Sequence, residues 1–300
     1  MARAVLISNP IASRTTPELA DTVLRTFRAG GWLVDWRETT GPLDARRFAL
    51  EAARSGADVV VVLGGDGTTM QSAAGLVGTE VPLGLIPGGT GNVLAGNLRI
   101  PSGPIQAAEL ILRGRSRSID LGRLDRPDGV HYFGVACGAG ADARVMGATP
   151  TDIKRKIGIG GYFNTLLHHI SAIRSAPFRI AIDGLVIESR AAVVLVLNCG
   201  EIIPPLIRVS RMAVPDDGWF DVVAFEMDSP WQGVRGFLRV LANVAFDTGD
   251  TGYVYYGRGR EIRIEADSPQ PVQSDGDVLG ETPLTAVMQA NAIRVMAPES

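Results

Sequence analysis

The sequence predicts an α/β fold in which a three-layer domain with a parallel sheet is followed by an antiparallel β-sandwich. Strand-like and helix-like stretches alternate over the first 120 residues, which is typical of a parallel sheet with helices on both faces. Within this region the apolar run Asp58–Leu63 leads directly into a glycine turn, as a buried parallel strand does. After residue 120, short strands separated by Asp-Gly turns take over, which favours a sandwich or barrel.

The elements of the first part can be placed in order. Thr15 is a candidate cap for the first helix, Glu18 completes a capping box, and Gly30-Gly31 end that helix. The predicted elements are the strand Ala4–Ser8, the helix Pro17–Ala29, the strand Trp32–Glu38, the helix Leu43–Ser55, the strand Asp58–Leu63, the helix Thr69–Val77, the strand Leu83–Ile86 and the helix Pro104–Arg113.

The second part reads as strands with two helical insertions, Asp152–Ser175 and Pro230–Phe246. Its predicted strands are Ser118–Leu124, Val130–Gly138, Phe178–Asp183, Leu185–Asn198, Trp219–Phe225, Tyr253–Arg263 and Leu284–Met296. We expect two domains, residues 1–120 and 121–300. The cleft between them is the expected ligand site.

The composition excludes several classes of function. A net charge of −3 provides no basic field for nucleic acid. Neither of the two lysines, Lys154 and Lys156, follows a glycine, so a Walker A loop is excluded. Cys137 and Cys199 lie in apolar segments, which favours buried free thiols over a disulfide scaffold.

No targeting or membrane-spanning segment is predicted. The N-terminal residues MARAVLISNP lack the long apolar core of a signal peptide. The longest uncharged stretch, Val81–Leu98, contains glycines and prolines that do not suit a transmembrane helix. We therefore expect a cytoplasmic protein, and the sequence leaves peripheral contact with a membrane surface open.

The most informative residues are the turn Gly64-Gly65-Asp66-Gly67-Thr68. A glycine turn between a strand and a helix lets phosphate oxygens approach backbone N–H groups. Asp66 can hold Mg²⁺ but would repel a bare phosphate. The turn therefore indicates a nucleotide bound with its metal, and hence phosphoryl transfer. A tight turn without any ligand is the alternative.

A second glycine turn, Pro87–Asn92, follows the next predicted strand, and Asn9-Pro10 follows the first strand. Two such turns on neighbouring strand ends could clasp a nucleotide at a switch point of the sheet. Thr68 and Thr90 offer hydroxyls to phosphate or ribose. Asn9-Pro10 alone also fits ordinary turn chemistry.

Together these three segments resemble the diacylglycerol kinase catalytic family, in particular its bacterial lipid kinases, which are related to sphingosine kinases and NAD kinases. Lys154–Gly158 with Tyr162, Asp216–Gly218 and Asp275–Asp277 extend the likeness over nearly the whole chain. The resemblance implies an ATP-dependent lipid kinase whose first domain binds ATP and whose sandwich faces a lipid with a free hydroxyl, such as diacylglycerol. It also implies a homodimer.

The resemblance assigns roles by position. Asp217 would be a side-chain ligand of a structural Mg²⁺, to which Val214 and Trp219 would offer backbone carbonyls. Asp277 would be the catalytic base where the family often has a glutamate, and Asp275 would orient water or metal beside it. Asp66 would act in catalysis through Mg²⁺. The residues implied to contact ATP are Asn9, Thr40, Gly64, Gly65, Asp66, Gly67, Thr68, Thr69, Met70, Gly89, Thr90 and Asn92.

Other interpretations stay open. Asp275-Gly276-Asp277 is also a plain hairpin signal. A NAD kinase-like enzyme with a soluble substrate is the runner-up, although Asp152 breaks the start of its motif at Thr149–Thr151. A nucleotide- or lipid-binding protein without turnover is the third, because Met70, Val93 and Asp277 depart from the family pattern.

Overall fold

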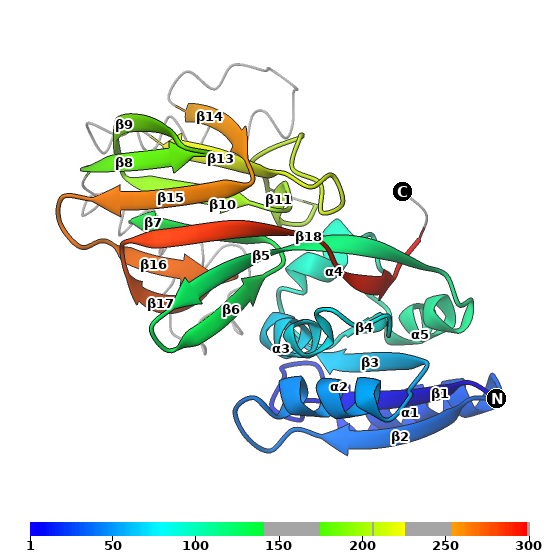
Figure 1. Ribbon diagram of the computed structural model, residues 1–300. Coiled ribbons are helices and arrows are strands. Elements are labelled where there is room, and N and C mark those ends of the chain that lie inside the picture. The colour runs from blue at the N-terminus through cyan, green and yellow to red at the C-terminus, as the bar shows by residue number, and fades with distance from the viewer. Residues whose placement is uncertain (141–174, 206, 226–253, 299–300) are drawn as a thin grey trace. The chain divides into compact units, whose positions relative to one another are not determined.

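The computed structural model describes residues 1–140, 175–205, 207–225 and 254–298 (Figure 1). The chain forms two compact units, one made of Met1–Leu121 with Ala290–Ser300 and the other of Gly122–Gln289. The segment from Ala290 thus belongs with the first unit, whereas the sequence pattern groups it with the second. The two helical segments predicted at 152–175 and 230–246, and with them Lys154 and Lys156, lie outside the described residues, except for Ser175.

The first unit is built on a parallel sheet with the strand order β2-β1-β3-β4-β18. The last strand joins β4 through the parallel pair Val295↔Leu83. In β3 every residue is buried, as expected for a strand covered on both faces. The strands of this sheet are β1 (Arg3–Ser8), β2 (Leu33–Glu38), β3 (Val59–Gly64), β4 (Leu83–Pro87) and the end of β18 (Leu284–Met296).

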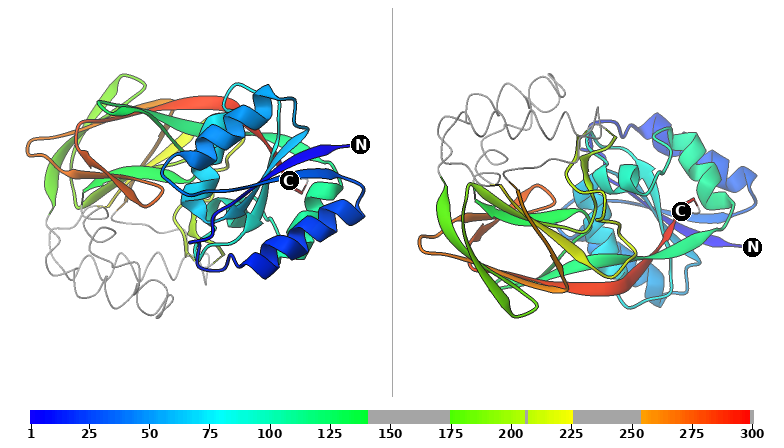
Figure 2. Two further views of the ribbon diagram at one scale, coloured as in Figure 1. Left: turned by 90° about the horizontal axis from the view of Figure 1, so that it is seen from below. Right: turned by 90° about the horizontal axis from the view of Figure 1, so that it is seen from above.

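Helices cover both faces of this sheet and complete the predicted three layers (Figure 2). The helices α1 (Pro17–Ala29) and α5 (Pro104–Leu112) pack together on one face. On the other face α2 (Asp44–Arg54) packs against α3 (Asp66–Leu76). A short helix α4 (Val93–Asn97) follows the second glycine turn.

The second unit contains two antiparallel sheets that share one apolar core, so the predicted fold class is confirmed. One sheet has the order β14-β13-β10-β7-β16-β17, and in the other β15 pairs with β18 and β8, and β8 with β9. Phe133 and Phe220 stack within the core with ring centroids 5.4 Å apart. The remaining strands are β5 (Ser116–Arg126), β6 (Gly129–Phe133), β7 (Ala136–Gly140), β8 (Ala176–Ile182), β9 (Leu185–Ala191), β10 (Val193–Leu197), β11 (Glu201–Ile203), β12 (Ile207–Arg208), β13 (Phe220–Phe225), β14 (Val254–Gly259), β15 (Glu261–Ala266), β16 (Pro271–Ser274) and β17 (Asp277–Glu281).

Three stretches predicted as single strands are each two strands, because the chain passes from one sheet to the other within them. Val130–Gly138 divides into β6 and β7, Leu185–Asn198 into β9 and β10, and Tyr253–Arg263 into β14 and β15. At the last of these corners Asp183 Oδ1 accepts hydrogen bonds from the backbone N–H groups of Arg260, at 2.9 Å, and Glu261, at 2.8 Å. A continuous strand-like pattern does not reveal such a corner, since the change of sheet depends on which strands pair and not on the local sequence.

Candidate functional site

The carboxyl ends of β1, β3 and β4 form one edge of the parallel sheet. The register pairs Ser8 with Leu63 and Gly64 with Pro87. Asn9 and the two glycine turns follow these strand ends directly, so the structure brings all three predicted loops to the same edge. This is the edge where open parallel sheets bind their ligands.

The two glycine turns touch each other through their backbones. The N–H of Gly88 donates to the carbonyl of Gly64 at 2.8 Å. A Cβ added to Gly89 would lie 2.6 Å from Gly65 Cα, and one added to Gly88 would lie 3.0 Å from Gly64 N. No side chain fits at these contacts, so the glycines are required for the approach of the two turns.

Asp66 joins the first turn to the second. Its Oδ1 accepts a hydrogen bond from Val93 N at 2.6 Å, and its other oxygen faces Gly91, where an added Cβ would lie 2.7 Å away. Burial raises the pKa of the Asp66 carboxyl above its ordinary value, and the backbone amides of Val93, Asn92 and Leu94 partly oppose that rise. The carboxylate therefore lies at the junction of the two turns.

Asn9 and Thr90 tie the loop after β1 to the glycine turns. Asn9 Nδ2 donates to Thr68 Oγ1 at 2.9 Å, which links the end of β1 to the first turn of α3. The hydroxyls of Ser13 and Thr90 share a hydrogen bond of 2.9 Å. The predicted residues Asn9, Thr68 and Thr90 thus belong to one hydrogen-bonded edge, and Ser13 joins them.

The first turn of α3 presents both hydroxyls and backbone amides. The side chains of Thr68 and Thr69 are buried, Met70 is half-buried and Gly67 is exposed. The first N–H groups of any helix have no partner within the helix and carry a partial positive charge. Gly67 therefore leaves backbone accessible at a point suited to an anion.

Thr40 lies on the loop after β2, at the same end of the sheet, and is exposed. Its N–H and hydroxyl both donate to Asp44 Oδ2, at 2.9 and 3.1 Å. The Arg47 guanidinium, followed by the amides of Thr40 and Gly41, holds the pKa of Asp44 well below its usual range. Asp44 thus fixes the conformation of the loop that carries Thr40.

In the second unit Asp275 and Asp277 occupy one hairpin but have different surroundings. Asp275 and Gly276 form the two-residue turn between β16 and β17, with φ of 45° and 92°, which is the geometry of an Asp-Gly hairpin. The Asp275 carboxylate accepts hydrogen bonds from Gly134 N at 2.7 Å, Val135 N at 3.0 Å and Ala136 N at 2.9 Å. Asp277 is exposed.

The predicted metal ligand Asp217 has an arginine beside it. Its Oδ1 accepts a hydrogen bond from Trp219 N at 3.0 Å, and its Oδ2 forms an ion pair with Arg258. A cationic side chain therefore holds the place that the sequence assigns to Mg²⁺, and these residues do not fit a divalent cation as arranged. Within the described ranges no group of three or more His, Cys, Asp or Glu side chains could hold a metal ion. The assignment of Val214, Asp217 and Trp219 stays a prediction.

Sequence reasoning did not single out Ser13, Asp44 or Arg258. Asp44 carried a recognisable pattern, since an acidic residue in the first turn of a helix is favoured by the positive end of the helix dipole. Ser13 and Arg258 act on residues far along the chain, Thr90 and Asp217. Their contacts depend on strand order and register, which no local pattern reveals.

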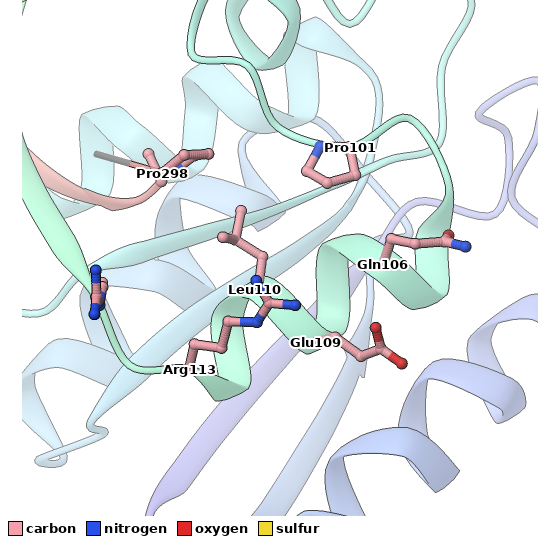
Figure 3. A pocket seen from close by; sticks show the side chains of 8 residues that line it. Pro101, Gln106, Glu109, Leu110, Arg113 and Pro298 are labelled. Carbon is pink, nitrogen blue, oxygen red and sulfur yellow. The ribbon is translucent and has the colours of Figure 1, made fainter. Parts of the chain in front are cut away.

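A separate pocket of about 700 Å³ lies beside α5 in the first unit. Figure 3 shows Leu110 rising from α5 toward the space between Pro101 and Pro298, with Arg113 beside it. None of the predicted nucleotide contacts lines this pocket. The sheet edge that carries the two glycine turns, rather than this pocket, is therefore the candidate site.

Among the described helices, none has the length and apolar character needed to cross a membrane.

Two family models match the chain in order. The diacylglycerol kinase catalytic domain matches residues 3–124, and the YegS C-terminal NAD kinase beta sandwich-like domain matches residues 135–297. A Mycobacterium tuberculosis protein named diacylglycerol kinase is 29% identical over 261 residues, covering 85% of this chain and 82% of that protein. A Bacillus subtilis protein of the same name is 26% identical over 304 residues, covering 100% of this chain and 97% of that protein.

The fold has a counterpart among solved structures. A diacylglycerol kinase structure from Bacillus anthracis str. Sterne superposes with a TM-score of 0.80 and 24% identity, covering 99% of this chain and 97% of that one. Because the two domain models together span almost the whole described fold, this chain belongs to the diacylglycerol kinase catalytic-domain family and carries the YegS-type C-terminal sandwich.

Proposed function

We propose that this protein transfers the γ-phosphoryl group of ATP to the free hydroxyl of diacylglycerol or a similar lipid. The observation that carries the proposal is the contact between the two glycine turns, with Asp66 at their junction. Family membership supports a kinase, and the names of the relatives support a lipid acceptor. Backbone N–H groups and one acidic side chain at a sheet edge are what a metal–nucleotide complex requires.

ATP would bind along the edge that carries Asn9, the two glycine turns and Thr40. The exposed backbone at Gly67 and the first turn of α3 offer N–H groups to phosphate oxygens. Asp66 would hold the Mg²⁺ that accompanies the nucleotide, since a carboxylate oxygen suits this hard cation. The cation supplies charge neutralisation on the phosphates.

In the proposed reaction the lipid hydroxyl oxygen forms a bond to the γ-phosphorus, and the bond from that phosphorus to the β–γ bridging oxygen breaks, leaving ADP. Asp277 would accept the hydroxyl proton. It is exposed and follows a tightly held turn. Asp275 supports this role as a positioning residue, because its carboxylate fixes the turn to the segment 134–136.

A lipid acceptor is met at a membrane surface, so the proposal includes a cytoplasmic protein that contacts the membrane peripherally. A homodimer is part of the same proposal and rests on the family resemblance alone. Peripheral contact would show as binding to lipid vesicles, and a dimer as the mass measured in solution.

The test is transfer of labelled γ-phosphate from ATP and Mg²⁺ to a panel of lipids in mixed micelles, with NAD as a further acceptor. Asp66→Asn and Asp277→Asn serve as controls. We expect one class of hydroxyl lipid to become labelled by the parent protein and by neither variant. Label on NAD alone would assign a soluble substrate instead. Nucleotide binding without any labelled product would overturn the enzyme assignment.

A further inference from the structure

Arg258 faces two acidic side chains of the second unit. The antiparallel register of β13 and β14 places it directly opposite Asp221, and its Nε donates to Asp221 Oδ1 at 2.8 Å. Its Nη2 reaches Oδ2 of Asp217, in the loop before β13. One guanidinium thus bridges two carboxylates with different nitrogen atoms, which suits its planar set of donors.

Asp221 needs this partner because its side chain is fully buried, with 0% exposure. A buried carboxylate without a positive or hydrogen-bonding partner is strongly destabilising. Its second oxygen, Oδ2, accepts the hydroxyl hydrogen bond of Ser210. Both oxygens of Asp221 are therefore satisfied by protein groups, and a positive charge already balances it.

The same contacts order the loop between β12 and β13. Ser210 Oγ accepts a hydrogen bond from Met212 N at 3.0 Å, which fixes the start of the loop. At its end Trp219 N donates to Asp217, and Arg260 lies over the Trp219 ring with its guanidinium carbon 4.5 Å from the centroid. The start of the loop is thus tied to Asp221, and its end to Arg258 and Arg260.

We propose that Arg258 replaces a structural divalent cation in this protein. Its guanidinium joins Asp217 to Asp221, and the loop between β12 and β13 holds its shape without bound Mg²⁺. The proposal depends on the arrangement of side chains in the second unit and is independent of the phosphoryl-transfer reaction. Any Mg²⁺ requirement of the protein then comes from the nucleotide alone.

The test measures thermal unfolding without nucleotide, in EDTA and in millimolar Mg²⁺. It uses the Asp66→Asn background, which removes the carboxylate proposed to hold the nucleotide's ion. Arg258→Met is the test variant. Arg263→Met is the matched control, because Arg263 forms an exposed ion pair with Glu265, and such pairs contribute little to stability.

We expect the same unfolding temperature in EDTA and Mg²⁺ for the background protein and the Arg263 control. Arg258→Met should unfold on the order of 10 °C lower in EDTA, and Mg²⁺ should recover part of that loss by neutralising the two carboxylates that have lost their arginine partner. A rise of several degrees with Mg²⁺ in the background protein would overturn the proposal.

Calorimetric titration of the background protein with Mn²⁺ gives a second readout, which holds even if Arg258→Met does not fold. No binding in the millimolar range supports the proposal. One bound ion that disappears in Asp217→Asn refutes it. Neither measurement uses kinase activity, so failure here and failure of the proposed function are distinguishable.

Discussion

Asp66 Oδ1 accepts a hydrogen bond from Val93 N at 2.6 Å, across 27 positions of sequence. This bond closes the first glycine turn onto the second. The same carboxylate is the proposed Mg²⁺ ligand, so one side chain both builds the site and acts in it. Its two roles can be separated, because an amide oxygen accepts the Val93 hydrogen bond but carries no charge.

Asp66→Asn should abolish phosphoryl transfer while leaving the fold intact. The Asn oxygen can keep the bond to Val93 N, whereas the negative charge that attracts Mg²⁺ is lost. Circular dichroism and thermal unfolding would check the fold, and labelled ATP would check the transfer. An active variant would remove Asp66 from the proposed mechanism.

The effect of Asp66→Asn on stability should depend on pH, because the pKa of the Asp66 carboxyl is raised, mainly by burial. The unfolded chain loses this proton near the ordinary pKa of about 3.9, while the folded protein holds it to higher pH. The contribution of the protonated Asp66 carboxyl to stability is therefore complete below pH 4 and is lost as the pH rises through the pKa of the folded protein. We expect the stability of Asp66→Asn relative to the parent protein to rise over that window. A stability difference that stays constant as the pH rises from 4 would contradict this.

The two glycine turns offer a matched pair of substitutions. Gly89→Ala places a methyl group 2.6 Å from Gly65 Cα. Because the backbone at Gly65 cannot move away easily, we expect the free energy of unfolding to fall by about 1–3 kcal/mol. Gly67→Ala meets nothing within 4 Å and lies in a helix, where alanine gains up to about 1 kcal/mol over glycine.

The stability of these variants tests the contact between the turns, whereas ATP affinity tests whether the first turn binds phosphate. If phosphate oxygens approach the backbone of the first turn, Gly67→Ala should weaken ATP binding although it folds at least as well as the parent. Chemical denaturation gives the stability, and fluorescence or calorimetric titration gives the affinity. Unchanged ATP affinity in Gly67→Ala would place the phosphates elsewhere.

The sequence predicts this site as far as its information is local. A strand, a glycine turn and a helix are contiguous at Val59–Leu76, and a parallel sheet forces all such turns to one edge. The contact between Gly65 and Gly89 and the bond from Asp66 to Val93 depend on β3 and β4 being neighbours. Strand order is a tertiary property, so the apolar pattern alone could not supply these contacts.

The strands of the sandwich are harder to predict from the sequence, because their pairing is also a tertiary property. The strands β16 and β17 are short and half-polar, and their sequence reads as a turn region. They are defined by the pairing of β16 with β7 and by the hydrogen bonds that the backbone N–H groups of residues 134–136 donate to Asp275. Arg258 is a comparable case, since its position opposite Asp221 follows only from the register of β13 and β14.

Asp44 provides a prediction for the loop that carries Thr40. The pKa of Asp44 is lowered, first by Arg47 and then by the amides of Thr40 and Gly41, so its stabilising contribution is present above the ordinary pKa of about 3.9 and is lost as the pH falls below it. Asp44→Asn should therefore unfold at a lower temperature than the parent at pH 7, with the gap narrowing below pH 4. A gap that widens on acidification would exclude this role.

Asp275 and Asp277 should respond oppositely to substitution. Hydrogen bonds to a charged group are worth about 1.5–3 kcal/mol each, and Asp275 accepts three from backbone amides. Asp275→Ala is therefore expected to cost roughly 3–5 kcal/mol of stability. Asp277 is exposed, so Asp277→Asn should change stability by less than about 0.5 kcal/mol.

For activity we expect a specific effect at Asp277, the residue whose substitution leaves stability almost unchanged. Loss of a general base lowers kcat by about 10²–10⁴-fold, so Asp277→Asn should be folded and nearly inactive, with the KM for ATP unchanged. Asp277→Glu keeps a carboxylate at this position and should retain most of the activity, which separates loss of the base from damage to the hairpin. Full activity in Asp277→Asn would exclude it as the base. Equal losses in Asp277→Asn and Asp277→Glu would instead show that the hairpin tolerates no change at this position, whatever the charge.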